Sequence, residues 1–133
     1  MSVPVPVTLL YGGLIGLLVT LLGANVSRVR AARGIGVQPV PPAELVRPIR
    51  AHGNAVEWAP LGLLLLLAVE LSGAGTRFTL HLAGGSLLLG RVLHAVGILT
   101  HGKVQTLGAG ITYLAMGSLA VWAIVIRFVQ YGP

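Results

Sequence analysis

The sequence of 133 residues contains no cysteine and few charged side chains. The lack of cysteine excludes disulfides, thiolate metal sites and cysteine nucleophiles, and cysteine usage therefore says nothing about the redox compartment. Charged residues make up 9 % of the chain, whereas a soluble domain carries about 25 %. Because hydrophobic residues reach 55 %, too few polar side chains remain to cover a small globule in water. The composition predicts one domain whose surface meets lipid.

Acidic residues are scarce, with three against nine lysines and arginines and a net charge of +6. Three scattered acids supply no paired catalytic carboxylates and no Ser–His–acid arrangement. The four histidines show no metal-ligand spacing, so we expect no metal site. The basic residues lie between apolar stretches, as they do in membrane proteins whose loops set the orientation. We therefore do not expect nucleic acid as a partner.

Four apolar stretches are long enough to cross a bilayer, which takes about 20 residues each. They cover about residues 5–26, 43–71, 78–99 and 104–129 of a single domain, 1–133. The first stretch lacks a basic n-region and runs for a full spanning length, so we expect a transmembrane helix and not a cleavable signal peptide. Short second and third connections favour antiparallel neighbours. The sequence predicts an all-α integral membrane protein, a bundle of four antiparallel transmembrane helices.

Glycine is frequent in the predicted spans, where small residues let helix backbones approach closely. We expect close packing at three sets of glycines, one each in the first, third and fourth spans: Gly12, Gly16 and Gly23; Gly84, Gly85 and Gly90; Gly110 and Gly117. The pattern supports a tight bundle and does not by itself indicate a site.

Basic residues are unevenly shared between the two sides of the predicted bundle. Five arginines lie in or beside the first loop and Lys103 lies in the third, whereas the opposite side holds Arg77 and Arg127. Cytoplasmic loops of membrane proteins carry the excess of lysine and arginine. We therefore expect the first and third loops in the cytoplasm and both termini outside.

Two of the spans carry polar side chains at helical spacing. Those of the second span stand at i, i+3, i+7 and i+10 and share one face: Arg47, Arg50, Asn54 and Glu57. The third span carries a second stripe at i, i+3 and i+10: Arg91, His94 and His101. Both stripes are expected to face the interior of the bundle or a ligand.

Glu57 is the most informative of these residues, because a charge at membrane depth costs a few kcal/mol or more and needs a partner. Arg91 is its natural buried partner. One interpretation is a structural ion pair that holds two helices together. The other is a polar pocket open at the cytoplasmic interface, suited to an anionic ligand that carries an amine. Arginines would clamp the carboxylates of such a ligand in bidentate fashion, and Glu57 and Asn54 would take its amine and amide groups.

Residues 50–60, RAHGNAVEWAP, resemble a segment of the MAPEG family, the membrane-associated proteins in eicosanoid and glutathione metabolism. The family shows the pattern Arg-Ala-x-x-Asn-x-x-Glu-x-x-Pro at the same place, after a loop of this type. The resemblance extends over the whole chain, in its four spans, its basic first loop and an arginine followed by a polar residue late in the third span.

The resemblance implies a homotrimer of four-helix subunits in a bacterial inner membrane, with glutathione bound as co-substrate between subunits near the cytoplasmic side. Five residues match the positions that would hold glutathione: Arg50, Asn54, Glu57, Arg91 and His94. Arg30 or Lys103 is the expected cationic partner of the thiolate or of a carboxylate. The implied function is a transferase or peroxidase reaction of glutathione with lipophilic small molecules, either electrophiles or lipid hydroperoxides, which reach the subunit cleft from the bilayer.

The chain departs from the family pattern at positions that matter for catalysis. Trp58 and His94 stand where several eicosanoid-pathway members have tyrosine, and Ile98 is apolar where those members have another. The arginine that stabilises the thiolate in those members has no clear match, and Lys103 and Gln105 are the nearest polar candidates. A nearby cation lowers the pKa of a thiol and creates the nucleophile. A non-catalytic lipid- or partner-binding protein of the same fold therefore stays open as an alternative.

A small proton-coupled exporter is a further alternative, since short four-span transporters can use a single membrane glutamate. Glu57 stands beside arginines, which suits an anion pocket better than a cation pathway.

Overall fold

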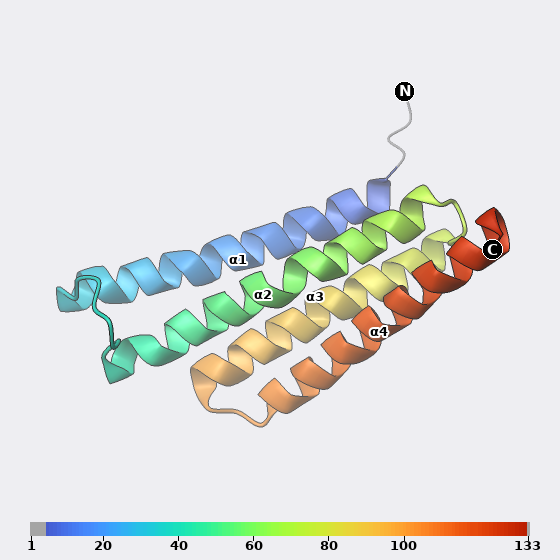
Figure 1. Cartoon of the computed structure of the whole chain (residues 1–133). Coiled ribbons are helices and arrows are strands. Elements are labelled where there is room, and N and C mark those ends of the chain that lie inside the picture. The colour runs from blue at the N-terminus through green and yellow to red at the C-terminus, as the bar shows by residue number, and fades with distance from the viewer. Residues whose placement is uncertain (1–4, 133) are drawn as a thin grey trace.

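The computed structural model describes residues 5–132, which form four helices joined by loops, with no strand in that range. The helices are α1 (Pro6–Arg33), α2 (Ala43–Leu71), α3 (Arg77–Thr100) and α4 (Val104–Tyr131). Each is long and apolar enough to cross a membrane. They run alternately up and down, so the α1–α2 and α3–α4 connections lie at one end of the bundle (Figure 1). The predicted fold class, an all-helical membrane protein with four spans, is confirmed.

The helix ends follow local sequence signals. α1 begins at Pro6, where the missing N–H is harmless, and it ends before Gly34, whose positive φ of 62° is readily adopted by glycine. It therefore continues past residue 26 through the polar turns that carry Arg28, Arg30 and Arg33. α3 begins after Thr76, whose hydroxyl accepts a hydrogen bond from the Thr79 amide at 3.2 Å.

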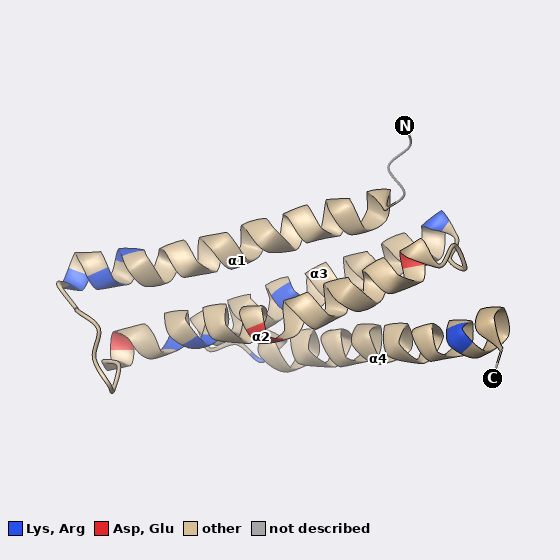
Figure 2. Ribbon diagram, turned by 45° about the horizontal axis from the view of Figure 1, so that its top comes forward, with Lys and Arg blue, Asp and Glu red and all other residues tan. Residues whose placement is uncertain are grey.

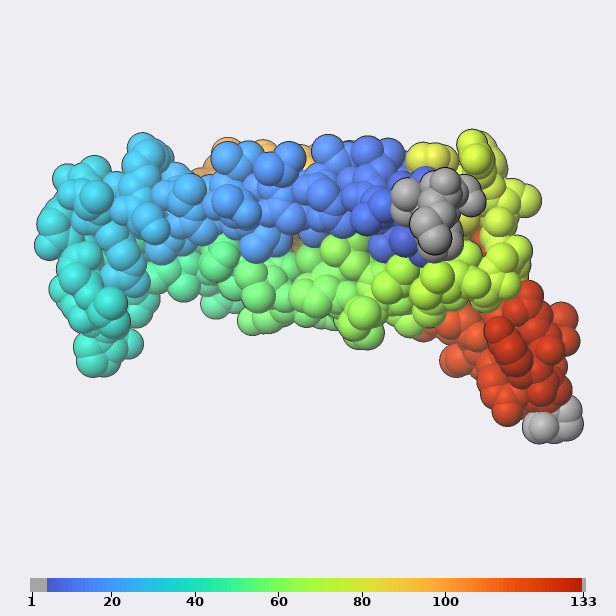
Figure 3. Space-filling model, turned by 90° about the horizontal axis from the view of Figure 1, so that it is seen from above, coloured from blue at the N-terminus to red at the C-terminus, as the bar shows by residue number. Residues whose placement is uncertain are grey.

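α2 and α3 lie at the centre of the arrangement. α1 packs against both of them, and α4 packs against both from the other side, while the described parts of α1 and α4 make no contact with each other. Figure 3 shows the C-terminal end of α4, in red, diverging from the body of the bundle. One apolar cluster surrounds Leu66, Leu87 and Leu119. A smaller one surrounds Leu22 and Ala55. It lies nearer the basic end, which is the end of the bundle with the α1–α2 and α3–α4 connections and most of the arginines. The two helices that carry the polar stripes, α2 and α3, are therefore the central pair.

The closest helix–helix approach joins α3 and α4. A Cβ added at Gly108 would overlap the backbone of His94, and one added at Gly97 would overlap the backbone of Gln105. Gly90 also packs against Thr112, as the sequence predicts for this glycine, and Gly84 lies directly under the ring of Tyr11. At four other glycines a Cβ would meet nothing within 4 Å in the described part of the chain, so they do not contribute to packing within the subunit: Gly12, Gly16, Gly110 and Gly117.

The first turn of α1 is held by an acid from α2. Glu70 is buried, with 9 % of its surface exposed, and its two carboxylate oxygens accept hydrogen bonds from the amides of Val7 at 2.8 Å and Thr8 at 2.7 Å. A carboxylate at a helix N-terminus pairs with free N–H groups and with the positive end of the helix dipole. Glu70 therefore fastens the start of α1 to the end of α2.

Candidate functional site

The most buried charged side chain of the described chain is Arg91 of α3, with 3 % of its surface exposed. Its Nε and one terminal nitrogen donate to the hydroxyl of Thr112 in α4, at 3.1 and 2.7 Å. The other terminal nitrogen donates to the side-chain oxygen of Asn54 in α2 at 2.7 Å. The guanidinium thus joins three helices in the middle of the bundle through neutral partners.

The expected pairing of Arg91 with Glu57 is wrong within the subunit. Arg91 donates to Asn54, while the side chain of Glu57 lies exposed on the outer surface of α2. The physical reason is the angle between positions along the polar stripe. At 100° per residue, Asn54 and Glu57 are separated by about 60° around the helix. Asn54 therefore faces α3 while Glu57 faces away from it.

The polar stripe of α2 divides in the same way along its length. Arg47, seven residues before Asn54, is half-buried and donates to the backbone oxygen of Ile98 in α3 at 2.9 Å. Arg50, seven residues before Glu57, is exposed like Glu57. One edge of the stripe therefore contacts α3, and the other carries a cation and an anion on the exposed surface of α2.

His94 turns toward α4, away from the α2 stripe. Its Nδ1 lies 3.0 Å from the backbone oxygen of Gln105, at the point where Gly97 and Gly108 bring α3 and α4 together. The side chain is half-buried. His94 is therefore one turn from Arg91 but contacts the start of the fourth helix.

A polar cleft of about 470 Å³ opens at the basic end of the bundle, between the start of α2 and the α3–α4 turn. Its walls hold two arginines, a histidine and a glutamine among the following residues: Val46, Arg47, Arg50, Ile98, His101, Gly102 and Gln105. His101 ends α3 with a positive φ of 61°. Of the five residues predicted to hold glutathione, the cleft includes Arg50, and Asn54 and Arg91 are hydrogen-bonded to each other.

The two predicted cationic partners lie on different elements. Arg30 of α1 is half-buried and donates to the backbone oxygen of Gly36 at 2.7 Å, so it closes its own loop. Lys103 is exposed and directly precedes α4, next to Gly102 of the cleft wall. Of the two candidates, Lys103 is therefore the one that directly follows a residue of the cleft wall in the sequence.

Two residues of α4 at the site were not predicted from the sequence. Thr112 is fully buried and accepts two of the Arg91 hydrogen bonds. Tyr113 packs on Trp58, with ring centroids 5.0 Å apart. The available signal was a threonine–tyrosine pair within a span of mostly small and aliphatic residues, four residues after Gly108. A single threonine is also common as a lipid-facing residue whose hydroxyl bonds to its own helix, so the signal was weak.

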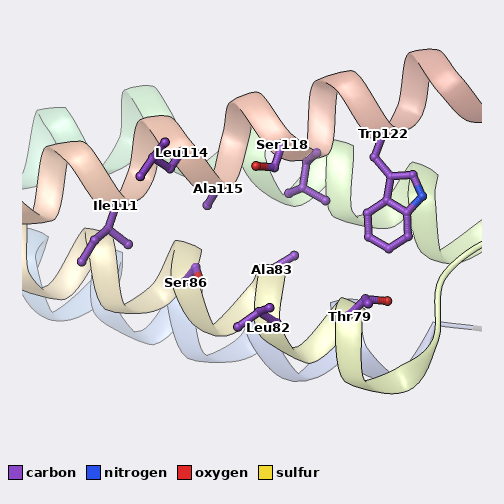
Figure 4. A pocket seen from close by; sticks show the side chains of 10 residues that line it. Thr79, Leu82, Ala83, Ser86, Ile111, Leu114, Ala115, Ser118 and Trp122 are labelled. Carbon is purple, nitrogen blue, oxygen red and sulfur yellow. The ribbon is translucent and has the colours of Figure 1, made fainter.

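An apolar groove of about 480 Å³ runs between α3 and α4 on the half of the bundle away from the basic end. Figure 4 shows Ile111, Leu114 and Trp122 of α4 facing Leu82 and Ala83 of α3, with the hydroxyls of Ser86 and Ser118 along the groove. The lining is mostly aliphatic and aromatic, and its polar groups are the hydroxyls of Thr79, Ser86 and Ser118.

Comparison with known proteins places these features in a family. A sequence model described as the MAPEG family matches residues 8–125. Inner membrane protein YecN of Escherichia coli strain K12 is 37 % identical over 91 residues, which cover 68 % of this chain and 69 % of YecN. YecN of Escherichia coli O6:H1 strain CFT073 matches to the same extent. The similarity to an inner membrane protein agrees with the four spans of the structure.

Proposed function

The chain belongs to the MAPEG family, and on that premise we propose that it binds glutathione within the membrane and conjugates it to lipophilic electrophiles, or uses it to reduce lipid hydroperoxides. The acting unit is a homotrimer in which neighbouring subunits cover the outer edge of the α2 stripe. The thiolate of glutathione attacks an electrophilic carbon, whose leaving group departs with the bonding electrons.

The exposure of Arg50 and Glu57 on a membrane helix is the observation that carries this proposal. Both side chains lie on the outer surface of α2, where lipid would penalise each charge by a few kcal/mol. Seven residues along a helix rise about 10 Å, and an extended tripeptide spans about the same length. A ligand with a carboxylate at one end and an ammonium group at the other matches this pair, because Arg50 binds the first and Glu57 the second.

The interior residues support the same ligand. Arg91 places a positive charge beside Asn54, and its described partners are neutral. Because Arg91 is buried, it would favour an anion at the α2 surface through its charge and through Asn54, without direct contact. Asn54 keeps its amide nitrogen as a donor while its oxygen accepts from Arg91. His94 lies one turn away, beside Gln105 of the cleft wall.

The thiolate requires a cation or strong donor close to the sulfur. Lys103 is our first candidate, because it precedes α4 at the edge of the polar cleft. Arg30 is the second and would act from a neighbouring subunit, since in its own subunit it bonds to Gly36. The lipophilic partner would enter through the apolar groove between α3 and α4, whose lining includes Ile111, one residue from Thr112.

Glutathione binding to the detergent-purified protein tests the proposal. We expect glutathione to raise the Tm of the wild type in a saturable manner. Arg50→Ala should weaken binding strongly because it removes the carboxylate clamp, and Glu57→Gln should weaken it because it removes the ammonium partner. The matched control is Arg77→Ala, which removes an exposed arginine at the opposite end of the bundle and should leave binding unchanged.

Native mass spectrometry of the same preparation measures the assembly. We expect a trimer that takes up glutathione. If millimolar glutathione neither binds nor stabilises the wild type, the proposal is wrong. Equal loss of binding in Arg77→Ala and Arg50→Ala would also contradict it, because the effect would then not depend on the α2 surface.

A second candidate function is glutathione or lipid binding without turnover. It is favoured by the placement of the two cationic candidates, since Arg30 is bonded within its own loop and Lys103 is exposed. Glutathione-dependent turnover of an aromatic halide or a lipid hydroperoxide that is lost in Lys103→Met would reject it. Binding of glutathione with neither reaction would establish it.

A further inference from the structure

A second cavity at the basic end lies between the end of α1, the start of α2 and the end of α3, with a volume of about 710 Å³. It shares Arg47 and His101 with the polar cleft but contains neither Arg50 nor Glu57. The proposed glutathione site leaves this cavity unassigned.

Two guanidinium groups line the cavity from different helices. Arg28 of α1 donates to the side-chain oxygen of Asn25 at 2.9 Å, and Arg47 of α2 donates to the backbone oxygen of Ile98 at 2.9 Å. Each of these bonds uses one of the five N–H donors of a guanidinium. The remaining donors suit an anion with several oxygens that lies between the two helices.

The charge of the lining favours an anion. The lining contains two arginines, Arg28 and Arg47, and one acid, Glu44. His101 adds a further donor at the edge. Figure 2 shows Lys and Arg positions, in blue, along both α1 and α2 at this end of the bundle. A phosphate group matches paired arginines because it accepts parallel hydrogen bonds from each.

The rest of the lining is apolar and includes Val29, Pro48 and Leu99. The cavity therefore has a basic part and an apolar part, at the end of helices that cross the membrane. This combination suits an amphiphile with an anionic head better than a small soluble ion. We propose that the cavity binds the phosphate headgroup of an anionic phospholipid, with Arg28 and Arg47 on the phosphate and the glycerol region against the apolar wall.

The test compares lipids by native mass spectrometry of the full-length protein, with added phosphatidylglycerol or phosphatidylcholine. We expect the first phosphatidylglycerol to bind well above phosphatidylcholine. Arg28→Gln should weaken its apparent affinity by about fivefold, the effect of one basic residue near an anionic lipid, and Arg28→Lys should retain most of it. The matched control is Arg33→Gln, which removes an exposed arginine from the same end of α1 but does not line the cavity.

Each outcome decides the proposal. Loss of affinity in Arg28→Gln with little change in Arg33→Gln supports a defined headgroup site. Equal loss in both variants, or no loss in Arg28→Gln, overturns it, because the attraction would then be the general one of a basic end for an anionic surface. Inorganic phosphate is the second probe. If it binds the lipid-free protein as tightly as phosphatidylglycerol does, and depends equally on Arg28, the assignment to a lipid is overturned in favour of a soluble phosphate.

Discussion

Arg91 of α3 and Thr112 of α4 are joined by two hydrogen bonds to a single hydroxyl, at 3.1 and 2.7 Å, in a part of the bundle that is closed to solvent. The same hydroxyl donates to the backbone oxygen of Gly108 one turn earlier in its own helix, at 2.9 Å. Thr112 is thus the link through which a buried cation is fastened to α4. Because Asn54 holds the other side of the guanidinium, one side chain fixes the spacing of three helices beside the candidate site.

Thr112→Val should destabilise the bundle. Valine keeps the shape of threonine but removes the acceptor, so two N–H groups of a buried guanidinium lose their partner. We expect a loss of about 1–2 kcal/mol in the free energy of unfolding, measured by thermal unfolding in detergent. Thr112→Ser should recover most of the loss. Thr20→Val is the control, since Thr20 is exposed and bonds only to its own helix at Gly16. A Thr112→Val protein as stable as the Thr20→Val protein would contradict the assigned role.

Gly108→Ala and Gly110→Ala should differ sharply although they lie two residues apart on α4. The added methyl at Gly108 would overlap the backbone of His94 and approach the oxygen of Gly90, whereas at Gly110 it meets nothing within 4 Å. Backbone cannot move aside as a flexible side chain can, so Gly108→Ala should cost about 1–3 kcal/mol of stability. Gly110→Ala should be neutral or slightly stabilising, because alanine favours helix. The Tm values of the two variants measure the difference, and equal values would show that α3 and α4 are not in close contact here.

The number and boundaries of the helices could largely be predicted from the sequence, because four apolar stretches of spanning length leave few alternatives. The end of α1 was less predictable. Residues 27–33 include three arginines and a serine but continue the helix to Arg33. Hydropathy alone does not distinguish a helix that leaves the membrane from a loop.

The sequence could not predict which edge of the polar stripe of α2 faces α3. Periodicity placed Arg47, Arg50, Asn54 and Glu57 on one face, but that face is about 80° wide at 100° per residue. Which edge contacts α3 depends on how the two helices are rotated against each other. The structure turns Asn54 inward and Glu57 outward, and that rotation is set by packing at small residues such as Ala51 and Ala55, which are buried between helices.

Glu70→Gln should loosen the start of α1 without unfolding the bundle. Glutamine still offers one oxygen to the amides of Val7 and Thr8, but it loses the second acceptor and the negative charge at the helix N-terminus. We expect a loss of about 0.5–1 kcal/mol, and a larger loss for Glu70→Ala, which removes both acceptors. Amide hydrogen exchange at Val7 and Thr8 should accelerate in the same order. Glu44→Gln is the control for the exchange measurement, because it removes an exposed acid from the first turn of α2 at the other end of that helix and should leave exchange at Val7 and Thr8 unchanged.

Ser118→Leu should weaken the use of the lipophilic substrate while leaving glutathione binding unchanged. Ser118 lines the apolar groove between α3 and α4 (Figure 4), and a leucine there would fill part of its volume of about 480 Å³. If this groove admits the lipophilic substrate, the KM for a bulky electrophile should rise while glutathione affinity and the Tm stay near those of the wild type, because Arg50, Asn54 and Glu57 lie outside the groove lining. A small electrophile should be affected less than a bulky one. Thr20→Leu places the same leucine side chain on an exposed face of α1 and should change neither constant. If Ser118→Leu lowered glutathione affinity and left the KM for the electrophile unchanged, the groove would not be the entrance, and the substrate would have to arrive along the face shared by neighbouring subunits.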